Sequence, residues 1–244
     1  MGFEILTPFS PSNFFPDVDE ADEYGLVGIG GHLTSDWLID AYSHGIFPWP
    51  FEDFRKPDRY HLGWFCVDPR CVIEFERFHV SRRLARTARC GRFTVTSDQN
   101  FHGVITSCAE GPNREGGTWI TPELIEAYME FHRLGYAHSI ETWLDGRLVG
   151  GLYGVALRGL FSAESMFYRE RDASKIALMA LVRHLDRQGF QLLDIQVASE
   201  HTLSLGASEI SRDSYLLRLH EAMQVEPDFG TVSDNGNRER SETK

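Results

Sequence analysis

Several stretches of the chain have apolar residues at helical spacing, with capping and helix-ending residues beside them. After Thr121, an N-cap residue followed by proline, apolar side chains recur with the helical period until Gly135. The longest such stretch, 173–188, is almost wholly apolar and is ended by Gly189. Further helices are predicted over 35–45, over 98–105 with Asp98 opening it, and over 210–223.

The segments between these helices predict strands. Residues 64–75 form a strand pattern interrupted by an Asp-Pro turn, and 138–157 form a hairpin around Asp145-Gly146. Strands are also predicted over 161–167 and 192–197, with the helix 173–188 between them. Because a strand-helix-strand unit makes a right-handed crossover, these two strands are expected to be parallel and adjacent. The pattern is that of an α/β protein.

Both of these strands carry polar side chains among apolar ones. Successive strand residues alternate between the two faces, so Ser162, Glu164 and Met166 are expected to share one face. Asp194 and Gln196 likewise share a face of the neighbouring strand, and the polar positions could line one cleft. An unpaired buried carboxylate is costly, so these residues are either paired in a structural network or functional.

Composition places the chain among ordinary globular proteins, with 244 residues, 42% hydrophobic and 25% charged. No stretch approaches the roughly 20 apolar residues of a membrane span, and the first residues lack the basic and apolar regions of a signal peptide. We therefore expect a cytoplasmic protein. Residues 225–244 are polar and are predicted to form a disordered tail.

The formal net charge is −12, yet the segment 70–92 is densely basic. Ser81 is expected to cap a short helix on which Arg82, Arg86 and Arg89 share one face. A row of guanidinium groups suits a phosphate backbone, although a solvated helix face has the same pattern.

Two other patterns do not meet the requirements of a zinc site or of a nucleotide-binding loop. The four cysteines form no CxxC pair, and His79 between two of them does not give the spacing of a structural zinc site, so reduced thiols are expected. The GIGG at 28–31 is followed neither by Gly-Lys-Ser/Thr nor by the third glycine and distant acid of a dinucleotide fold.

Ten blocks of the chain occur in the order and spacing of one known family. They are IFPWP, WFCVDPR, EGGTWIT, HSIETW, GGLYGVA, ESMFYR, ASKIAL, DIQV, HTLSLGA and EI. In these blocks the chain closely resembles the leucyl/phenylalanyl-tRNA-protein transferase family, from about Phe15 to Met223. The resemblance implies a small N-terminal domain over 1–72 and a catalytic domain over 73–224. That second domain is expected to have the acetyltransferase-like (GNAT) fold, a mixed sheet with flanking helices.

The resemblance also implies an activity. Such enzymes move Leu, also Phe and less so Met, from aminoacyl-tRNA to the α-amine of proteins that begin with Arg or Lys. The product carries a degradation signal of the N-end rule pathway. These enzymes use neither a metal nor a nucleotide cofactor, and we expect a monomer with no membrane association.

The site residues implied by the resemblance follow position by position. Glu164 and Gln196 match the family's proposed proton-relay pair, and Asp194 matches an acid important for activity, as base or as anchor. The other matches are Met166, Leu152 and Ser162 for the aminoacyl pocket, Trp49 and Trp119 for the terminal adenosine, and Arg82, Arg86 and Arg89 for the acceptor stem. Core packing is the alternative role for the apolar residues among them.

Two other classes of protein stay open. An acetyl-CoA-dependent acetyltransferase needs an (Arg/Gln)xxGx(Gly/Ala) loop leading into a helix, and the nearest match, RLVGGL from Arg147, continues as strand. A non-catalytic tRNA-binding or degron-binding module needs the basic face and the tryptophans but not Glu164 with Gln196. Phe65, Cys66-Val67 and Ala163 depart from the family pattern, so the preference between Leu and Phe is open.

Overall fold

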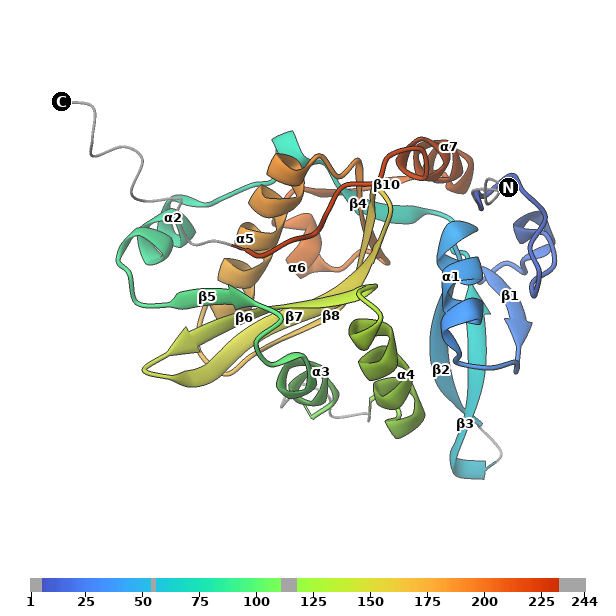
Figure 1. Cartoon of the computed structure of the whole chain (residues 1–244), viewed down its shortest axis with the longest axis horizontal. Coiled ribbons are helices and arrows are strands. Elements are labelled where there is room, and N and C mark those ends of the chain that lie inside the picture. Colours follow the sequence, from blue (N-terminus) through green and yellow to red (C-terminus); the bar gives the residue numbers. More distant parts are fainter. Residues whose placement is uncertain (1–5, 54–55, 111–117, 233–244) are drawn as a thin grey trace.

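The chain forms two β-sheets, and the larger one carries most of the helices (Figure 1). The fold is described from a computed structural model over residues 6–53, 56–110 and 118–232. The three-stranded sheet has the order β1 (Leu26–Ile29), β3 (Lys56–Phe65), β2 (Phe47–Asp53). The seven-stranded sheet has the order β10 (Ala207–Ile210), β4 (Arg70–Ile73), β9 (Leu192–Gln196), β8 (Leu160–Tyr168), β7 (Arg147–Leu157), β6 (Ala137–Leu144), β5 (Thr94–Ser97).

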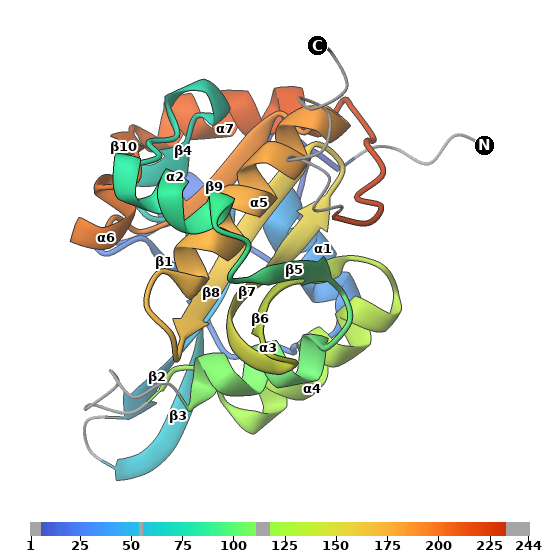
Figure 2. The same ribbon diagram turned by 90° about the vertical axis from the view of Figure 1, so that its left-hand side faces the viewer.

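The two faces of the larger sheet are covered by different helices. One face packs against α5 (Ala173–Gln188), and the opposite face packs against α3 (Phe101–Ala109) and α4 (Pro122–Arg133) (Figures 1 and 2). The remaining helical segments are η1 (Val18–Glu20), α1 (Ser35–Ser43), η2 (Phe75–Arg77), α2 (Arg82–Arg89), α6 (Glu200–Leu203) and α7 (Arg212–Ala222). The core is therefore divided into two apolar clusters, one on each side of the sheet.

The predicted crossover is confirmed. β8 and β9 are parallel neighbours joined through α5, while the other neighbouring strands of the larger sheet are antiparallel. The parallel pairing stops at Ser162↔Asp194, so the carboxyl-terminal half of β8 has no β9 partner. This mixed sheet with flanking helices, preceded by a small separate sheet, is the acetyltransferase-like fold class expected from the sequence.

A β-bulge in β8 changes which side chains share a face. Tyr153 pairs with Ser165 and Gly154 pairs with Ala163, so Glu164 is the extra residue between them. A bulge breaks the strict alternation of a strand and re-aims its side chains. Met166 therefore lies on the α5 face with Ala163, opposite Ser162 and Glu164. The expectation that Ser162, Glu164 and Met166 share one face is wrong for Met166.

Local signals place most helix ends where the sequence predicts them. The side chains of Ser81 and Thr121 each accept a hydrogen bond from the backbone N–H three residues on, as N-caps do. One start is corrected, because Asn100 rather than Asp98 caps α3. The Asp98 carboxylate instead accepts the N–H of Ser139, 2.8 Å away, and contacts a histidine of β6.

The structure bears on two expected domain limits. The expected boundary at 72/73 falls inside β4, which pairs on both sides within the larger sheet, so the division of the chain at that point stays a prediction.

Residues 225–232 differ from the disordered tail that the sequence predicts, because Phe229 and Val232 are buried. The Phe229 ring stacks on His138 with ring centroids 3.9 Å apart. The rest of the predicted tail, 233–244, lies outside the described residues.

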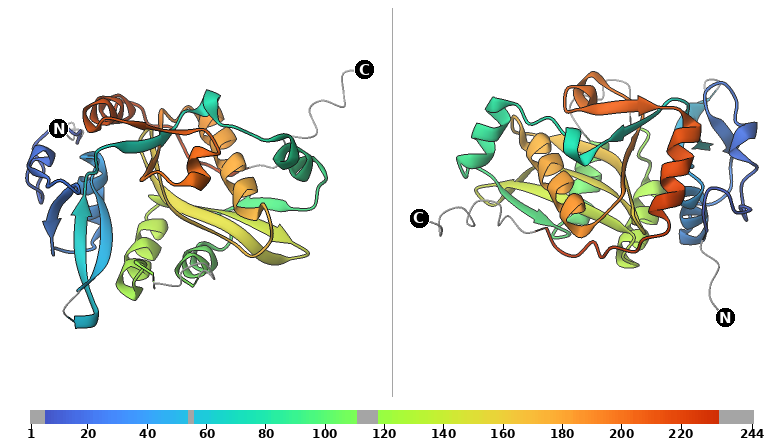
Figure 3. Two further views of the ribbon diagram at one scale, coloured as in Figure 1. Left: turned by 180° about the vertical axis from the view of Figure 1, so that it is seen from behind. Right: turned by 90° about the horizontal axis from the view of Figure 1, so that it is seen from above.

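The small sheet and α2 lie at opposite ends of the molecule, with the larger sheet between them (Figure 3). Any ligand that contacts both ends must therefore run along the larger sheet. None of the helices described here is long and apolar enough to cross a lipid bilayer.

Candidate active site

A buried ion pair stands next to the open end of the parallel strand pair. Arg70 of β4 donates from Nε to Oδ1 of Asp194 (2.9 Å) and from Nη2 to Oδ2 (2.6 Å). Tyr215 donates to the same Oδ2 at 2.9 Å, and the Arg70 guanidinium also lies over the Tyr215 ring, 4.3 Å from its centroid. Asp194 is completely buried, and its oxygens are taken up by these contacts. Both carboxylate oxygens of Asp194 are therefore engaged by neighbouring donors.

Asp194 also fixes the backbone of Gln196. The N–H of Gln196 donates to Asp194 Oδ1 at 2.9 Å, and Gln196 has a φ of 56°, in the left-handed region. A residue other than glycine rarely adopts this conformation, and such strain gathers at functional sites. The pairing with β4 is irregular at this point, because Cys71 pairs with Gln196 and Val72 pairs with Asp194, which leaves Ile195 as an extra residue.

In this conformation the Gln196 side chain reaches β8. Its Nε2 lies 2.7 Å from Ser162 Oγ and 3.1 Å from Glu164 Oε1. Ser162 Oγ in turn donates to Glu164 Oε1 at 3.1 Å. The structure therefore brings together three of the residues expected from the sequence, and they form one hydrogen-bonded group.

The pKa of Glu164 is raised to about 7. Burial is the main cause, because it disfavours the charged carboxylate, and the Asp194 charge adds to it. Hydrogen bonds from Tyr42 and Ser162, and the Arg70 charge, act in the opposite direction. A carboxyl group with this pKa can both take up and release a proton near neutral pH.

Two tyrosines from helices α1 and α4 complete the surroundings of Glu164. The hydroxyls of Tyr42 and Tyr128 contact each other, and both side chains are fully buried. Burial first, and the nearby Glu164 charge second, raise the pKa of each tyrosine well above its usual value. Both therefore stay neutral, and since each hydroxyl has one proton, one of them can donate to the carboxyl group while the other donates to its neighbour.

A cavity of about 170 Å³ opens onto this group. Its lining residues are Phe47, Pro48, Trp49, Trp119, Glu164, Ile195, Gln196 and Val197. The rings of Trp49 and Trp119 lie 6.2 Å apart at an angle of 54°, and Trp49 is 37% exposed. The two tryptophans therefore share one cavity with Glu164 and Gln196, although these residues come from segments far apart in the sequence.

Met166 and Leu152 are not among the residues that line this cavity. They pair across β8 and β7, and Leu152 is buried in the apolar cluster on the α5 face, against which Met166 packs. Ile195 belongs to the same cluster and does line the cavity. The cavity wall is thus continuous with the cluster that contains the two expected pocket residues.

The three expected acceptor-stem arginines are exposed on α2, and none of them lines this cavity. The helix, its Ser81 cap and its basic face are as predicted.

Sequence reasoning missed Arg70, Tyr42 and Tyr128. The sequence groups Arg70 with the basic segment 70–92, whereas the structure buries it beneath the site. One signal for Arg70 was available, since it opens a strand whose other residues are apolar, directly after an Asp-Pro turn. The tyrosines sit at ordinary core positions of amphipathic helices, and nothing in the local sequence marks them.

The fold and the site together define an α/β protein with a buried carboxyl group of raised pKa beside an aromatic-walled cavity. The family model for the leucyl/phenylalanyl-tRNA protein transferase matches residues 72–220, and the model for the N-terminal domain of the same family matches residues 31–68. The chain belongs to this family.

Individual relatives agree with this assignment. A leucyl/phenylalanyl-tRNA–protein transferase of Syntrophotalea carbinolica is 48% identical over 85% of this chain and 88% of its own length. One of Aromatoleum aromaticum is 50% identical over 81% of this chain and 82% of its own. Among solved structures, an acetyltransferase-like protein of Streptococcus suis is 14% identical with a TM-score of 0.35, covering 72% of this chain and 64% of its own. A TM-score this low supports no assignment of function.

Proposed function

We propose that this chain transfers Leu, also Phe and less so Met, from aminoacyl-tRNA to the α-amine of proteins that begin with Arg or Lys. The transfer would mark those proteins for degradation by the N-end rule pathway. Family membership supports the aminoacyl-tRNA donor and the protein acceptor. The observation that carries the proposal is the carboxyl group of Glu164, with a pKa of about 7, hydrogen-bonded to Gln196 at the end of an aromatic-walled cavity.

The chemistry required is modest, because an aminoacyl ester is already activated and needs no ATP. The amine nitrogen attacks the ester carbonyl, a C–N bond forms, and the bond between that carbon and the ribose oxygen breaks. The amine loses a proton in the process and the ribose oxygen gains one. We assign the removal of the amine proton to Glu164, with Gln196 and Ser162 holding its Oε1 in place. The α-amine has an unperturbed pKa of about 8, so a base with a pKa near 7 is well matched to it.

Asp194 is proposed to act as a positioning residue. Its pairing with Arg70 and Tyr215 leaves it well placed to hold Gln196 and poorly placed to accept a substrate proton. The negative charge it adds near Glu164 is one of the factors that raise the Glu164 pKa.

The donor is proposed to occupy the cavity in two parts. Trp49 and Trp119 offer aromatic faces for the terminal adenosine, since unpaired bases commonly stack on such side chains. The Leu or Phe side chain enters the gap where β8 and β9 are unpaired. Beyond Ile195 it meets the cluster of Leu152 and Met166, and an unbranched methionine can adapt to either side chain.

The remaining parts of the proposal concern the contact with tRNA, the oligomeric state, the cofactors and the location in the cell. The exposed face of Arg82, Arg86 and Arg89 would contact the acceptor stem through phosphates, which gives affinity without sequence information. We propose a cytoplasmic monomer that acts without a metal or nucleotide cofactor. The supply of aminoacyl-tRNA favours the cytoplasm.

The test is transfer of radiolabelled Leu from purified Leu-tRNA to a peptide that begins with Arg, without ATP or CoA. A peptide that begins with Asp serves as the matched acceptor control. Transfer to the Arg peptide alone is expected. A folded protein that binds Leu-tRNA and transfers to neither peptide would instead be a tRNA-binding module, and a requirement for CoA would indicate an acetyltransferase.

A further inference from the structure

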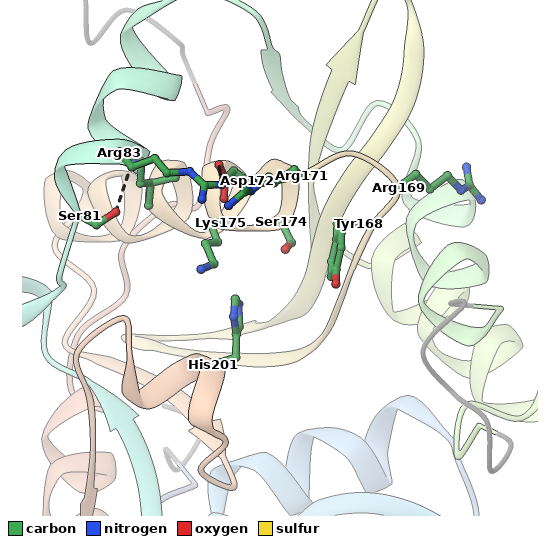
Figure 4. A pocket seen from close by; sticks show the side chains of 10 residues that line it. Ser81, Arg83, Tyr168, Arg169, Arg171, Asp172, Ser174, Lys175 and His201 are labelled. Carbon is green, nitrogen blue, oxygen red and sulfur yellow. Dashed lines mark hydrogen bonds and ion pairs between the residues drawn. The ribbon is translucent and has the colours of Figure 1, made fainter.

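A second and larger cavity, of about 420 Å³, lies where β8 ends and α5 begins (Figure 4). Its walls come from α2, the β8–α5 connection, α5 and α6. The lining residues are Ser81, Arg83, Leu84, Tyr168, Arg169, Arg171, Asp172, Ser174, Lys175 and His201. The proposed chemistry uses none of them.

The side chains directed into this cavity are donors of hydrogen bonds. Figure 4 shows Lys175, Ser174 and Tyr168 pointing into one space, with His201 facing them from α6, while the Arg169 guanidinium points away. At the rim, Arg83 forms an ion pair with Asp172 at 2.9 Å. Within the described part of the chain, Lys175 has no such carboxylate partner.

His201 and Lys175 act on each other across the cavity. Burial is the main cause that lowers the pKa of His201, and the Lys175 charge lowers it further. An anion between them would offset both effects, because it would accept hydrogen bonds from the two side chains and favour a charged imidazole. The cavity is thus chemically complementary to a negatively charged oxygen group.

The cavity lies between the two parts of the proposed donor site, the strand that carries Glu164 and the helix α2. Tyr168 is four residues beyond Glu164 on the same strand, which corresponds to about 13 Å along β8. On its other side the cavity is bounded by Arg83 and Leu84 of α2, the helix that exposes Arg82, Arg86 and Arg89. The cavity therefore lies between the helix with the arginine face and the strand that carries Glu164.

We propose that this cavity binds a phosphodiester group of the single-stranded 3′ end of the tRNA, between the acceptor duplex and the terminal adenosine. Lys175 supplies the positive charge, and Ser174, Tyr168 and His201 supply hydrogen bonds to the phosphate oxygens. The inference rests on the proposed function, since it takes aminoacyl-tRNA as the donor. It adds a site that binds the phosphate backbone of the 3′ strand.

Binding measurements test this without requiring transfer. The probes are the unacylated trinucleotide CpCpA, adenosine alone and inorganic phosphate, each titrated calorimetrically against the full chain at fixed salt. The variants are Lys175→Gln and Arg183→Gln. Arg183 is an exposed residue two turns further along α5, so its variant loses the same charge from the same helix outside the cavity. Thermal unfolding of each variant checks that it is folded.

Lys175→Gln is expected to weaken CpCpA binding about tenfold, as loss of a charged hydrogen bond does. The Kd for adenosine should change less than twofold, and Arg183→Gln should change neither value by more than twofold. Equal losses for CpCpA and adenosine would mean an indirect structural effect and overturn the proposal. Equal losses from both variants would mean unspecific electrostatics and overturn it as well.

Further outcomes distinguish a free anion from a tRNA phosphate as the ligand of the cavity. They also distinguish a failure of the phosphate site from a failure of the proposed function. Inorganic phosphate that binds as tightly as CpCpA, with the same dependence on Lys175, would assign the cavity to a free anion and overturn the tRNA proposal. Binding of CpCpA should also raise the pKa of His201, followed by NMR. If Lys175-dependent CpCpA binding persists while Leu transfer fails, the proposed function fails and the phosphate site stands. If transfer succeeds and CpCpA binding does not depend on Lys175, the phosphate site alone fails.

Discussion

Arg70 reaches from β4 to hold both carboxylate oxygens of Asp194, with the Nε–Oδ1 distance 2.9 Å and the Nη2–Oδ2 distance 2.6 Å. The pair is completely buried, and Oδ1 also accepts the backbone N–H of Gln196. The ion pair therefore sets the conformation of the residue that holds Glu164. It connects the stability of the larger sheet to the geometry of the proposed active site.

Replacing Asp194 by Asn should destabilise the protein by about 3–5 kcal/mol, because the buried Arg70 charge would lose its partner. The free energy of unfolding in urea measures this. The double variant Arg70→Met/Asp194→Leu should be less destabilised than either single variant, since no charge is left buried. As a control, Arg92→Gln breaks the exposed pair with Glu170 and should cost at most about 1 kcal/mol.

The role of Asp194 in positioning has its own measurement. At a temperature where Asp194→Asn is folded, kcat for Leu transfer should fall while KM for Leu-tRNA changes little, because Gln196 and Glu164 are displaced but the tryptophans are not. An unchanged kcat would show that the anchor is not needed for the chemistry.

Glu164 should give the transfer rate a pH dependence centred near neutrality. If its carboxylate accepts the amine proton, kcat rises as pH passes through the folded pKa of about 7 and then levels off. Glu164→Gln should lower kcat about 10²- to 10⁴-fold and remove the rise near pH 7. The acceptor amine titrates separately, near pH 8, and its contribution should remain in the variant. A variant profile that keeps the rise near pH 7 would assign it to another group.

The same group should make stability decrease as the pH rises. In the unfolded chain the Glu164 carboxyl ionises near its ordinary pKa of 4.5, whereas in the folded protein it stays protonated until about 7. Between these pH values the folded state binds more protons, so the free energy of unfolding falls with rising pH and then stays constant above about 7. Glu164→Gln should lack this decrease. Urea unfolding at pH 4.5 and pH 8 compares the two proteins, and an equal change in both would contradict the raised pKa.

Local sequence signals were enough for the longer helices and for the pairing of β8 with β9. Thr121, Pro122 and Gly135 mark both ends of α4 by chemistry that acts within a few residues, and the structure has the helix between them. The crossover rule likewise placed β8 beside β9, and with them Glu164 near Gln196.

Other features depend on partners far away in the sequence, and these were not predictable. Arg70 and Asp194 are 124 residues apart, and the sequence around either gives no sign of the other. The bulge at Glu164 arises from the register between β7 and β8, whereas the β8 sequence alone looks like a regular alternating strand. Phe229 lies in a polar segment, and its burial depends on the histidine and phenylalanine rings it meets.

Trp49 and Trp119 should contribute to donor binding through their aromatic faces. Stacking of a base on an aromatic ring is worth about 1–3 kcal/mol, so Trp119→Ala should raise KM for Leu-tRNA by about 5- to 160-fold, while Trp119→Phe retains most of the affinity. The KM for the acceptor peptide should stay unchanged in both variants. Equal KM values for Leu-tRNA in the Ala and Phe variants would point to core packing as the role of this ring.

The bulge that aims Glu164 into the cavity depends on Gly154, which stands opposite Ala163. A Cβ at Gly154 would lie 2.3 Å from the carbonyl oxygen of Ser162 and 2.5 Å from the Phe161 ring, so β7 and β8 would have to move apart. Gly154→Ala should therefore destabilise the protein by about 1–3 kcal/mol and lower kcat, because the backbone that holds Ser162 and Glu164 shifts. Urea unfolding and single-turnover transfer measure the two effects.

Gly28 of β1 provides the matched control, because a Cβ there would meet no atom within 4 Å. Gly28→Ala should stay within about 0.5 kcal/mol of the parent and keep its kcat. If Gly154→Ala behaves like this control, β8 tolerates a shift at the bulge, and the position of Glu164 does not depend on close contact with β7. If only Gly154→Ala loses both stability and kcat, the close approach of the two strands is what orients the carboxyl group toward Gln196.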